Sequence, residues 1–255
     1  MLLTIDIGNT TIKLGVFEGD NLKASWHIAT DIDRLADEYA VVLLELLKQK
    51  GIAADAVKKV AMCSVVPPLT TTFDELLSSY FGISPLVIEA GVKTGVRIRM
   101  DNPREVGADR IVNAAAAHNL YGGPVIIVDL GTATTFDAVS ADGDYLGGAI
   151  APGMVIAIET LSERAAMLPR VELVRPSKVI GSNTISAMQS GILFGYVGLV
   201  EGLVGRIKKE LGEKTKVVAT GGYARLIAAE TAIIDAVNTD LTLHGLKQIY
   251  SINRA

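Results

Sequence analysis

Two segments of the chain repeat one pattern, and this repeat limits the possible folds more than any other feature. Each segment contains an apolar strand, an Asp-x-Gly corner rich in hydroxyl residues, a second apolar strand and an acidic turn with glycine. The segments are residues 3–20 (LTIDIGNTTIKLGVFEGD) and 124–150 (PVIIVDLGTATTFDAVSADGDYLGGAI). Aligning Asp6 with Asp129 separates the two copies by about half of the chain. The sequence therefore predicts that a β-hairpin unit is duplicated.

Both hairpins are followed by alternating helix and strand patterns. Helical apolar spacing occurs at 32–51 and 69–82, and apolar strand patterns occur at 57–66, 85–89 and 216–220. Antiparallel hairpins followed by this alternation are typical of two similar α/β lobes with a cleft between them. We expect mixed sheets with flanking helices, a first lobe at residues 1–112 and a second at 113–255. The sequence itself limits the boundary only to the stretch between Pro103 and Pro124.

The composition fits a globular chain, because 49% of the 255 residues are hydrophobic and 20% are charged. The net charge of −4 and the pI near 5.5 offer no broad basic surface, so we expect no nucleic-acid partner. The single cysteine, Cys63, excludes an internal disulfide and is typical of a reducing compartment. Its apolar surroundings predict a small buried side chain.

Charged residues interrupt the amino-terminal apolar stretch at Asp6 and Lys13, which argues against a signal peptide. The longest uncharged window, residues 179–200, carries polar side chains throughout its first half. We therefore expect this window to form a buried helix and not to cross a bilayer. These features predict a cytoplasmic protein without a membrane partner.

The two Asp-x-Gly corners combine the features of a phosphate-binding loop. Glycine allows a ligand to approach the backbone closely, and successive N–H groups with hydroxyls can surround an anion. A carboxylate cannot hold phosphate itself, but it can bind a magnesium ion through its oxygens. One such corner alone is better explained by an ordinary hairpin turn. Two matching corners in duplicated lobes predict binding of one polyphosphate from opposite sides.

Gly221 and Gly222 form a third corner, between the strand pattern at 216–220 and a helical pattern. On its own, this corner is more simply explained as a tight strand-to-helix turn. With the other two corners it predicts the adenosine-binding edge of a nucleotide site. The sequence has neither a Gly-Lys-Ser/Thr phosphate loop nor a G-x-G-x-x-G pattern, so the common alternatives fail.

These motifs resemble the acetate kinase, sugar kinase, Hsp70 and actin superfamily, whose duplicated lobes carry phosphate loops of this form. Four segments together resemble the type III pantothenate kinases: DIGNTTIKLGVF, DNPREVGADR, DLGTATTFDAV and GSNTISAMQSGI. The resemblance implies duplicated ribonuclease H-like lobes, as in the actin-like ATPases. It also implies transfer of the ATP γ-phosphoryl group to pantothenate, which gives 4'-phosphopantothenate in the first step of coenzyme A synthesis.

The resemblance implies roles for individual residues. Asp109 would be the catalytic proton acceptor, although a helix-capping role explains the same position. Asp6 would bind magnesium. Asp129 would bind potassium or ammonium, with an Asx turn as the simpler explanation. The ATP-binding residues would be Asp6, Ile7, Gly8, Asn9, Thr10, Thr11, Ile12, Lys13 and Thr132. Lys13 is also explained as a solvated surface residue.

The pantothenate pocket implied by the resemblance contains Met100, Gly107, Ala108, Asp109, Arg110 and Thr184. Arg110 can pair with a carboxylate. Thr184 is equally explained as the N-cap of the helix that follows it. Family members often carry an aromatic residue where this chain has Met100, which leaves only apolar contact there.

Five glycines recur at spacings of four and three residues along one face of the helical pattern at 184–211. They are Gly191, Gly195, Gly198, Gly202 and Gly205. An interior helix glycine costs about 1 kcal/mol relative to alanine. We therefore expect this face to pack closely against another backbone, either a second copy of the chain or a neighbouring helix. Because the family is dimeric, the resemblance favours a homodimer.

Two other functions fit the same fold. A noncatalytic regulatory binding protein would not need the acidic residues, whereas Asp6, Asp109 and Asp129 are all present. A kinase for a different small alcohol, such as a sugar, is disfavoured by the VGADR segment at residues 106–110.

Overall fold

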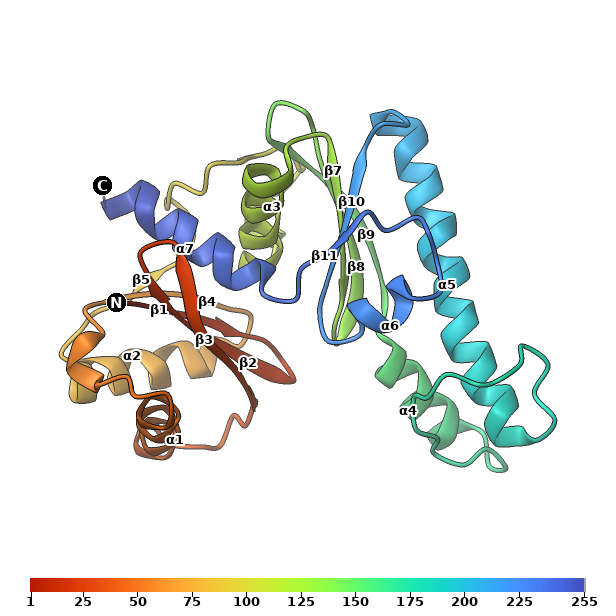
Figure 1. The fold of residues 1–255 in the computed structure, drawn as a ribbon, viewed down its shortest axis with the longest axis horizontal. Coiled ribbons are helices and arrows are strands. Elements are labelled where there is room, and N and C mark those ends of the chain that lie inside the picture. The colour runs from red at the N-terminus through yellow and green to blue at the C-terminus, as the bar shows by residue number, and fades with distance from the viewer. Residues whose placement is uncertain (255) are drawn as a thin grey trace. The chain divides into compact units, whose positions relative to one another are not determined.

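The computed structural model describes residues 1–254, which form two compact units, each built on a mixed β-sheet (Figure 1). The first unit comprises Met1–Arg97, Asp101–Ala116 and the chain from Asp240 onward. The second unit comprises Ile98–Met100 and Ala117–Thr239.

The first unit holds a five-stranded sheet in the order β3-β2-β1-β4-β5. Its strands are β1 (Leu2–Ile7), β2 (Thr11–Glu18), β3 (Asn21–Ala29), β4 (Lys59–Ser64) and β5 (Leu86–Val87). β1 and β2 form an antiparallel hairpin in which Asp6 pairs with Lys13. β1 lies between β2 and β4. β4 is parallel to β1, and their register places Cys63 beside Asp6.

The second unit repeats this arrangement in a sheet of order β11-β10-β7-β8-β9-β6. Its strands are β6 (Arg97–Ile98), β7 (Val125–Leu130), β8 (Ala133–Val139), β9 (Asp144–Pro152), β10 (Lys216–Thr220) and β11 (Ala236–Val237). The run β9-β8-β7-β10-β11 matches β3-β2-β1-β4-β5, and β10 is parallel to β7 as β4 is to β1. The predicted duplication is confirmed.

The duplication extends to the irregularities of the two sheets. The β2–β3 ladder shifts register at Val16–Phe17, and the β8–β9 ladder shifts at Ala138–Val139. The corner at residues 131–132 is shorter than the corner at residues 8–10. Val16 pairs with Leu3 of β1, and Ala138 pairs with Ile126, the equivalent residue of β7. The two register shifts therefore occupy equivalent positions, so β2 and β8 bend at the same place.

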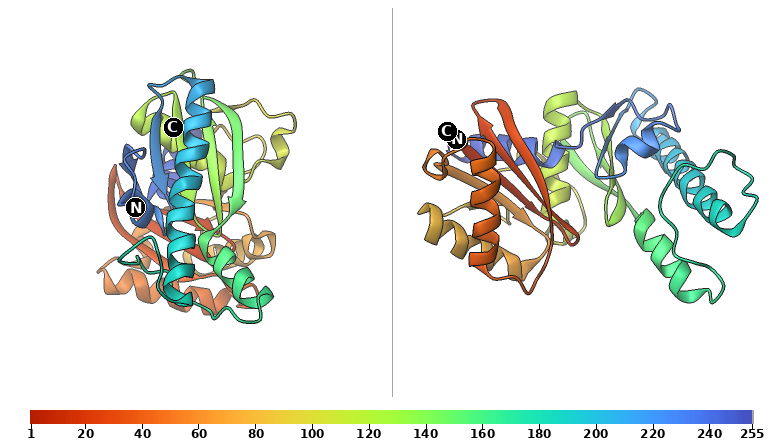
Figure 2. Two further views of the ribbon diagram at one scale, coloured as in Figure 1. Left: turned by 90° about the vertical axis from the view of Figure 1, so that its right-hand side faces the viewer. Right: turned by 60° about the horizontal axis from the view of Figure 1, so that its bottom comes forward.

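Helices cover the sheets, and apolar side chains of the helices pack against apolar side chains of the strands (Figure 2). They are α1 (Ala36–Gln49), α2 (Pro67–Phe81), α3 (Ala108–Tyr121), α4 (Met154–Arg164), α5 (Thr184–Leu211), α6 (Ala224–Ala228) and α7 (Leu241–Arg254). Two 3₁₀ turns lie at Ala54–Ala56 and Pro103–Glu105. In the first unit, α1 and α2 pack on one face of the sheet, while α7 and the start of α3 pack on the other.

The position of α7 departs from the predicted division of the chain at residues 112 and 113. Leu243, Leu246 and Ile249 of α7 are fully buried in one apolar cluster with Leu2 and Ala61 of the first unit. The carboxyl-terminal helix therefore completes the first unit, although it follows the second hairpin in sequence. Its apolar spacing predicts a buried helical face but does not identify the sheet that the face covers.

Residues 179–200 were expected to form a buried helix. The helix α5 begins only at Thr184, and it is buried along one side only. Leu193, Val197 and Val200 pack with Phe136 on one face of the second sheet. By length and composition alone, α5 is apolar enough to cross a membrane, and 33% of its most apolar window is buried. The polar residues at the start of α5 therefore do not exclude a membrane span. Its packing against the second sheet, however, is the packing of a core helix.

Candidate active site

The first Asp-x-Gly corner, residues 8–10, is a tight turn between β1 and β2. The Gly8 amide donates to the Thr11 carbonyl at 3.1 Å. The Thr30 hydroxyl donates to the Gly8 carbonyl at 2.7 Å and ties the corner to the end of β3. A Cβ on Gly8 would lie 2.9 Å from the Thr11 carbonyl oxygen, so this turn favours glycine. Asn9 and Thr10 are exposed at the tip, where a ligand can reach them.

Asp6 is the second-last residue of β1, close to this corner, and it is only 7% exposed. Lys13 Nζ lies 3.8 Å from Asp6 Oδ2, and the Cys63 thiol donates to Oδ1 at 3.4 Å. Burial raises the pKa of Asp6; Lys13 opposes that rise, and the charge of Asp109 adds to it. The Lys13 side chain is 15% exposed. Its explanation as a solvated surface residue is therefore wrong.

Asp109 is the second residue of α3, and its carboxylate folds back over Gly107. A Cβ on Gly107 would lie 2.5 Å from Asp109 Oδ1, so a larger residue at 107 would displace that carboxylate. The Arg110 amide donates to Oδ1 at 2.8 Å. Burial raises the pKa of Asp109, while the Arg110 amide and the Arg110 charge oppose the rise. The carboxylate thus satisfies a first-turn amide and still has a second oxygen that can accept a proton.

Asp6, Lys13 and Asp109 belong to one cluster in the first unit. The charge of Asp109 raises the pKa of both Asp6 and Cys63, although burial is the largest cause at each of those residues. Two motifs far apart in the sequence therefore meet at the carboxyl end of β1. Buried carboxylates in one cluster repel each other, and a bound cation relieves that repulsion.

Thr30 contacts the first corner and Cys63 contacts Asp6, and neither contact was predicted from the sequence. The strand pattern at 57–66 predicts a buried cysteine, which is confirmed. Its position beside Asp6 depends on the parallel register of β1 and β4. No local sequence signal specifies that register.

The second Asp-x-Gly corner, residues 131–132, has the same character. The Gly131 amide donates to the Ala133 carbonyl at 3.0 Å, and Thr132 is exposed. Gly221 lies beside this corner with φ at +91°, a region that favours glycine. A Cβ on Gly221 would lie 2.6 Å from Asp129 Oδ1 and 2.6 Å from the Leu130 carbonyl oxygen. The second and third predicted corners are therefore adjacent in the second unit.

The donor atoms at these corners suit hard cations held jointly with a ligand. Within residues 1–254, no group of three or more His, Cys, Asp or Glu side chains could enclose a metal ion. Magnesium commonly takes one or two carboxylates and completes its shell with water and phosphate oxygens. Asp6 fits that pattern. The carboxylate of Asp129 and the Leu130 carbonyl fit the all-oxygen surroundings of a monovalent cation.

The residues predicted for the pantothenate pocket fall into three places. Gly107, Ala108 and Arg110 are half-buried around the start of α3. Met100 packs on Gly147 in the second unit, where a Cβ on Gly147 would lie 2.6 Å from Met100 Sδ. Thr184 begins α5.

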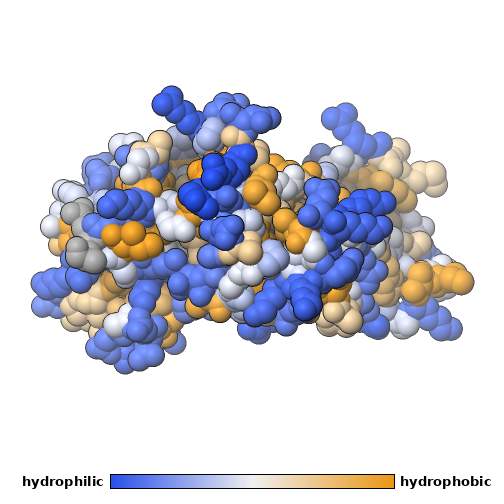
Figure 3. Space-filling model, turned by 90° about the horizontal axis from the view of Figure 1, so that it is seen from above, coloured by the Kyte–Doolittle hydropathy of each residue, from blue (hydrophilic) through white to orange (hydrophobic). Residues whose placement is uncertain are grey.

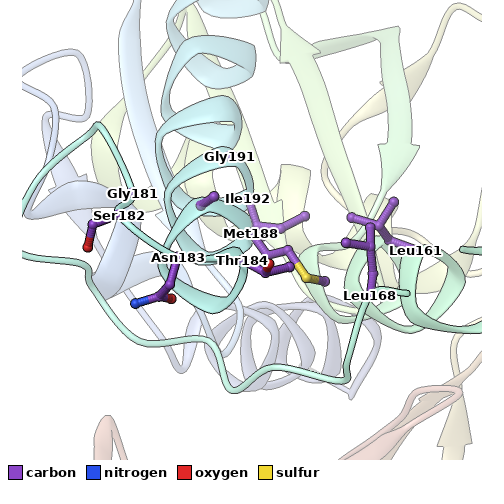
Figure 4. Close-up of a pocket in the computed structure, with 10 residues that line it drawn as sticks. Leu161, Leu168, Gly181, Ser182, Asn183, Thr184, Met188, Gly191 and Ile192 are labelled. Atoms are coloured by element: carbon purple, nitrogen blue, oxygen red, sulfur yellow. The ribbon is translucent and has the colours of Figure 1, made fainter. Parts of the chain in front are cut away.

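Thr184 lines a pocket of about 600 Å³ within the second unit. Met188 and Ile192 of α5 face Leu161 of α4 across this pocket (Figure 4). The N-cap of α5 is Asn183, whose side chain accepts from the Ser186 amide at 2.9 Å. The explanation of Thr184 as the N-cap is therefore wrong, and its exposed hydroxyl remains available to a ligand.

The glycine face of α5 points away from the sheet that α5 covers. A Cβ on Gly191, Gly195, Gly198 or Gly205 would meet no other atom within 4 Å. A Cβ on Gly202 would meet only the Arg206 guanidinium, at 3.3 Å. Within residues 1–254, no neighbouring helix packs against this face, so that alternative is wrong.

Exposed apolar side chains are scattered among hydrophilic ones on the face displayed in Figure 3. Isolated exposed apolar residues of this kind are normal for a folded chain. The displayed face therefore adds no second candidate site.

The sequence model of the type III pantothenate kinase family matches residues 2–206. A type III pantothenate kinase from Dehalococcoides mccartyi is 61% identical over 254 residues, which cover 100% of this chain and 98% of that protein.

Two solved structures share the fold at low identity. A conserved protein assigned to the Baf family of transcriptional activators, from Campylobacter jejuni, gives a TM-score of 0.62 at 19% identity, covering 99% of this chain and 98% of that one. An inorganic polyphosphate/ATP-glucomannokinase from Arthrobacter gives 0.52 at 16% identity, covering 98% of both chains. These likenesses confirm the predicted fold class alone, and they give the regulatory alternative no support.

Proposed function

We propose that this chain, which belongs to the type III pantothenate kinase family, transfers the γ-phosphoryl group of ATP to the primary hydroxyl of pantothenate. The product is 4'-phosphopantothenate, in the first step of coenzyme A synthesis. The observation that carries the proposal is the cluster of Asp6, Lys13 and Asp109 behind an exposed glycine corner. The free thiol of Cys63 accords with a cytoplasmic location.

In this reaction, Asp109 accepts the proton of the pantothenate hydroxyl. The hydroxyl oxygen bonds to the γ-phosphorus, and the bond from that phosphorus to the β–γ bridging oxygen breaks. Because the transition state is loose, positioning and charge neutralisation supply most of the acceleration, and the base supplies a smaller part. Burial keeps Asp109 more basic than an exposed aspartate, which favours proton acceptance.

Residues 6–13 and Thr132 contact the nucleotide in this proposal. The amides and hydroxyls of the first corner would surround phosphate oxygens, with Lys13 adding a positive charge. Asp6 would hold magnesium, which neutralises phosphate charge when it is bound. Asp129 would hold potassium or ammonium.

Pantothenate carries a carboxylate, an amide and apolar methyl groups, and the remaining residues suit these groups. Arg110 would pair with the carboxylate, beside Gly107 and Ala108. Met100 would supply apolar contact, and Thr184 would donate a hydrogen bond.

We further infer that the glycine face of α5 packs against the same face of a second copy. If the face were free, Gly198→Ala would stabilise the fold by about 1 kcal/mol, the difference in helix propensity. In a close backbone contact, the added methyl group instead destabilises the dimer. We expect Gly198→Leu to yield monomers in sedimentation equilibrium and Gly198→Ala to lower the unfolding midpoint.

The control is Glu210→Ala, an exposed change on the same helix outside the stripe. It should leave both the oligomeric state and the midpoint nearly unchanged. A monomeric parent protein, or a Gly198→Ala variant that is more stable, would contradict the proposed interface.

The direct test of the function uses the purified full chain with ATP, magnesium and potassium. We expect ADP release that depends on pantothenate and a product with the mass of phosphopantothenate. A panel of sugars and small alcohols should give much slower release. Equal rates with a sugar would replace the proposed substrate, and ATP binding without turnover of any alcohol would favour the regulatory alternative.

A further inference from the structure

We propose that the hydroxyl of Thr220 is a ligand of the monovalent cation that Asp129 binds, an inference that rests on the proposed function. Thr220 ends β10 and is fully buried. Its Oγ1 makes no hydrogen bond within residues 1–254, a property shared only with Thr134 Oγ1 among their buried side-chain oxygens and nitrogens. Buried polar atoms are nearly always paired, so an unpaired hydroxyl beside a carboxylate corner points to a bound partner there.

The strand register places Thr220 directly beside Asp129. β10 and β7 are parallel, and Thr220 pairs with Asp129 across them. Val217 and Ala219 belong to the apolar cluster under α5, as do Ile126 and Val128 of β7. Because side chains alternate along a strand, Thr220 and Asp129 share the opposite face of the sheet.

Three kinds of oxygen belong to this corner of the second unit. The Leu130 carbonyl accepts from the Tyr223 amide at 3.3 Å and has a second lone pair. Asp129 Oδ1 and the Leu130 carbonyl oxygen both lie 2.6 Å from where a Cβ on Gly221 would stand. Gly221 directly follows Thr220, so the hydroxyl, the carboxylate and the carbonyl belong to one corner. Carboxylate, hydroxyl and carbonyl oxygens are the ligands that hard cations prefer.

The chemistry of β10 also favours a functional hydroxyl. The strand reads Lys-Val-Val-Ala-Thr, and valine has nearly the same shape as threonine. Valine at position 220 would pack without leaving a polar atom unpaired. The chain instead keeps an oxygen beside the carboxylate expected to bind a cation.

The test compares Thr220→Val with Thr134→Val, each a near-isosteric change that removes one unpaired hydroxyl. Thr134 pairs with Leu130, which belongs to the cluster under α5, so it faces away from Asp129. Unfolding midpoints are measured while potassium chloride replaces choline chloride at constant ionic strength, with and without magnesium and ADP. This readout requires neither pantothenate nor turnover.

We expect potassium to raise the midpoint of the parent protein and of Thr134→Val. In Thr220→Val, the potassium concentration for half of this effect should rise about tenfold or more, and Thr220→Ser should restore it. Without potassium, Thr220→Val should be at least as stable as the parent.

An unchanged potassium response in Thr220→Val would overturn the inference, as would the absence of any response in the parent protein. Pantothenate phosphorylation is measured separately. Its failure with a normal potassium response would contradict the proposed function and leave the cation site intact.

Discussion

Replacing Asp109 with asparagine is expected to reduce kcat by about a hundredfold or more, the usual contribution of a general base. Asparagine keeps the shape of the side chain and can still accept the hydrogen bond from the Arg110 amide. It cannot take a proton from the alcohol. The loss corresponds to about 2.7 kcal/mol of transition-state stabilisation. Because Asp109 does not act on the nucleotide in the proposal, the KM for ATP should change little.

The pH profile separates the loss of a base from a general disturbance. Burial raises the pKa of Asp109, and only the ionised carboxylate accepts a proton. In the parent protein, kcat/KM for pantothenate should therefore fall as the pH falls through this raised pKa. With magnesium and ATP at saturation, where the titration of Asp6 does not limit the rate, the asparagine variant should lack that acidic limb.

The control is Asp74→Asn, the same chemical change at an exposed position of α2. Stopped assays across the pH range, with thermal unfolding of each variant, give the comparison. Parent-like turnover in Asp109→Asn would remove Asp109 from the proton transfer.

The duplicated hairpins and their phosphate corners could be predicted because each depends on residues that are close together in the sequence. Apolar alternation, an acidic strand end and glycine lie within a few residues at Asp6 and again at Asp129. The ladders of the two hairpins then follow from the turns. The placement of α7 could not be predicted, because its buried residues Leu243 and Leu246 specify a helical face and not a sheet.

The contacts that complete the corners also could not be predicted, since they depend on registers between distant strands. Cys63 reaches Asp6 only because β4 pairs in parallel with β1. The equivalent pairing of β10 with β7 places Thr220 beside Asp129. The duplication relates these two placements. In each unit, the strand parallel to the first hairpin strand places a small polarisable or polar side chain beside the corner aspartate.

Replacing Asp6 with asparagine is expected to lower kcat/KM for ATP about a thousandfold, or about 4 kcal/mol, because the charge that holds magnesium is removed. Asparagine retains an oxygen that can accept from the Cys63 thiol, so the packing of β1 against β4 is preserved. The neighbouring Lys13 would then lose the carboxylate oxygen that lies 3.8 Å from its Nζ and would repel magnesium more strongly.

Titration with magnesium discriminates this loss from local misfolding. In the parent protein, burial raises the pKa of Asp6, so the apparent magnesium affinity should increase as the pH rises through that value. In Asp6→Asn, the affinity should be weak and independent of pH, and high magnesium should restore part of the activity. Calorimetric titration of magnesium in the presence of ADP measures both properties, with Asp74→Asn again as the matched control. If Asp6→Asn binds magnesium and ADP with parent-like affinity, the metal is held elsewhere, and the buried charge of Asp6 then serves to order Lys13.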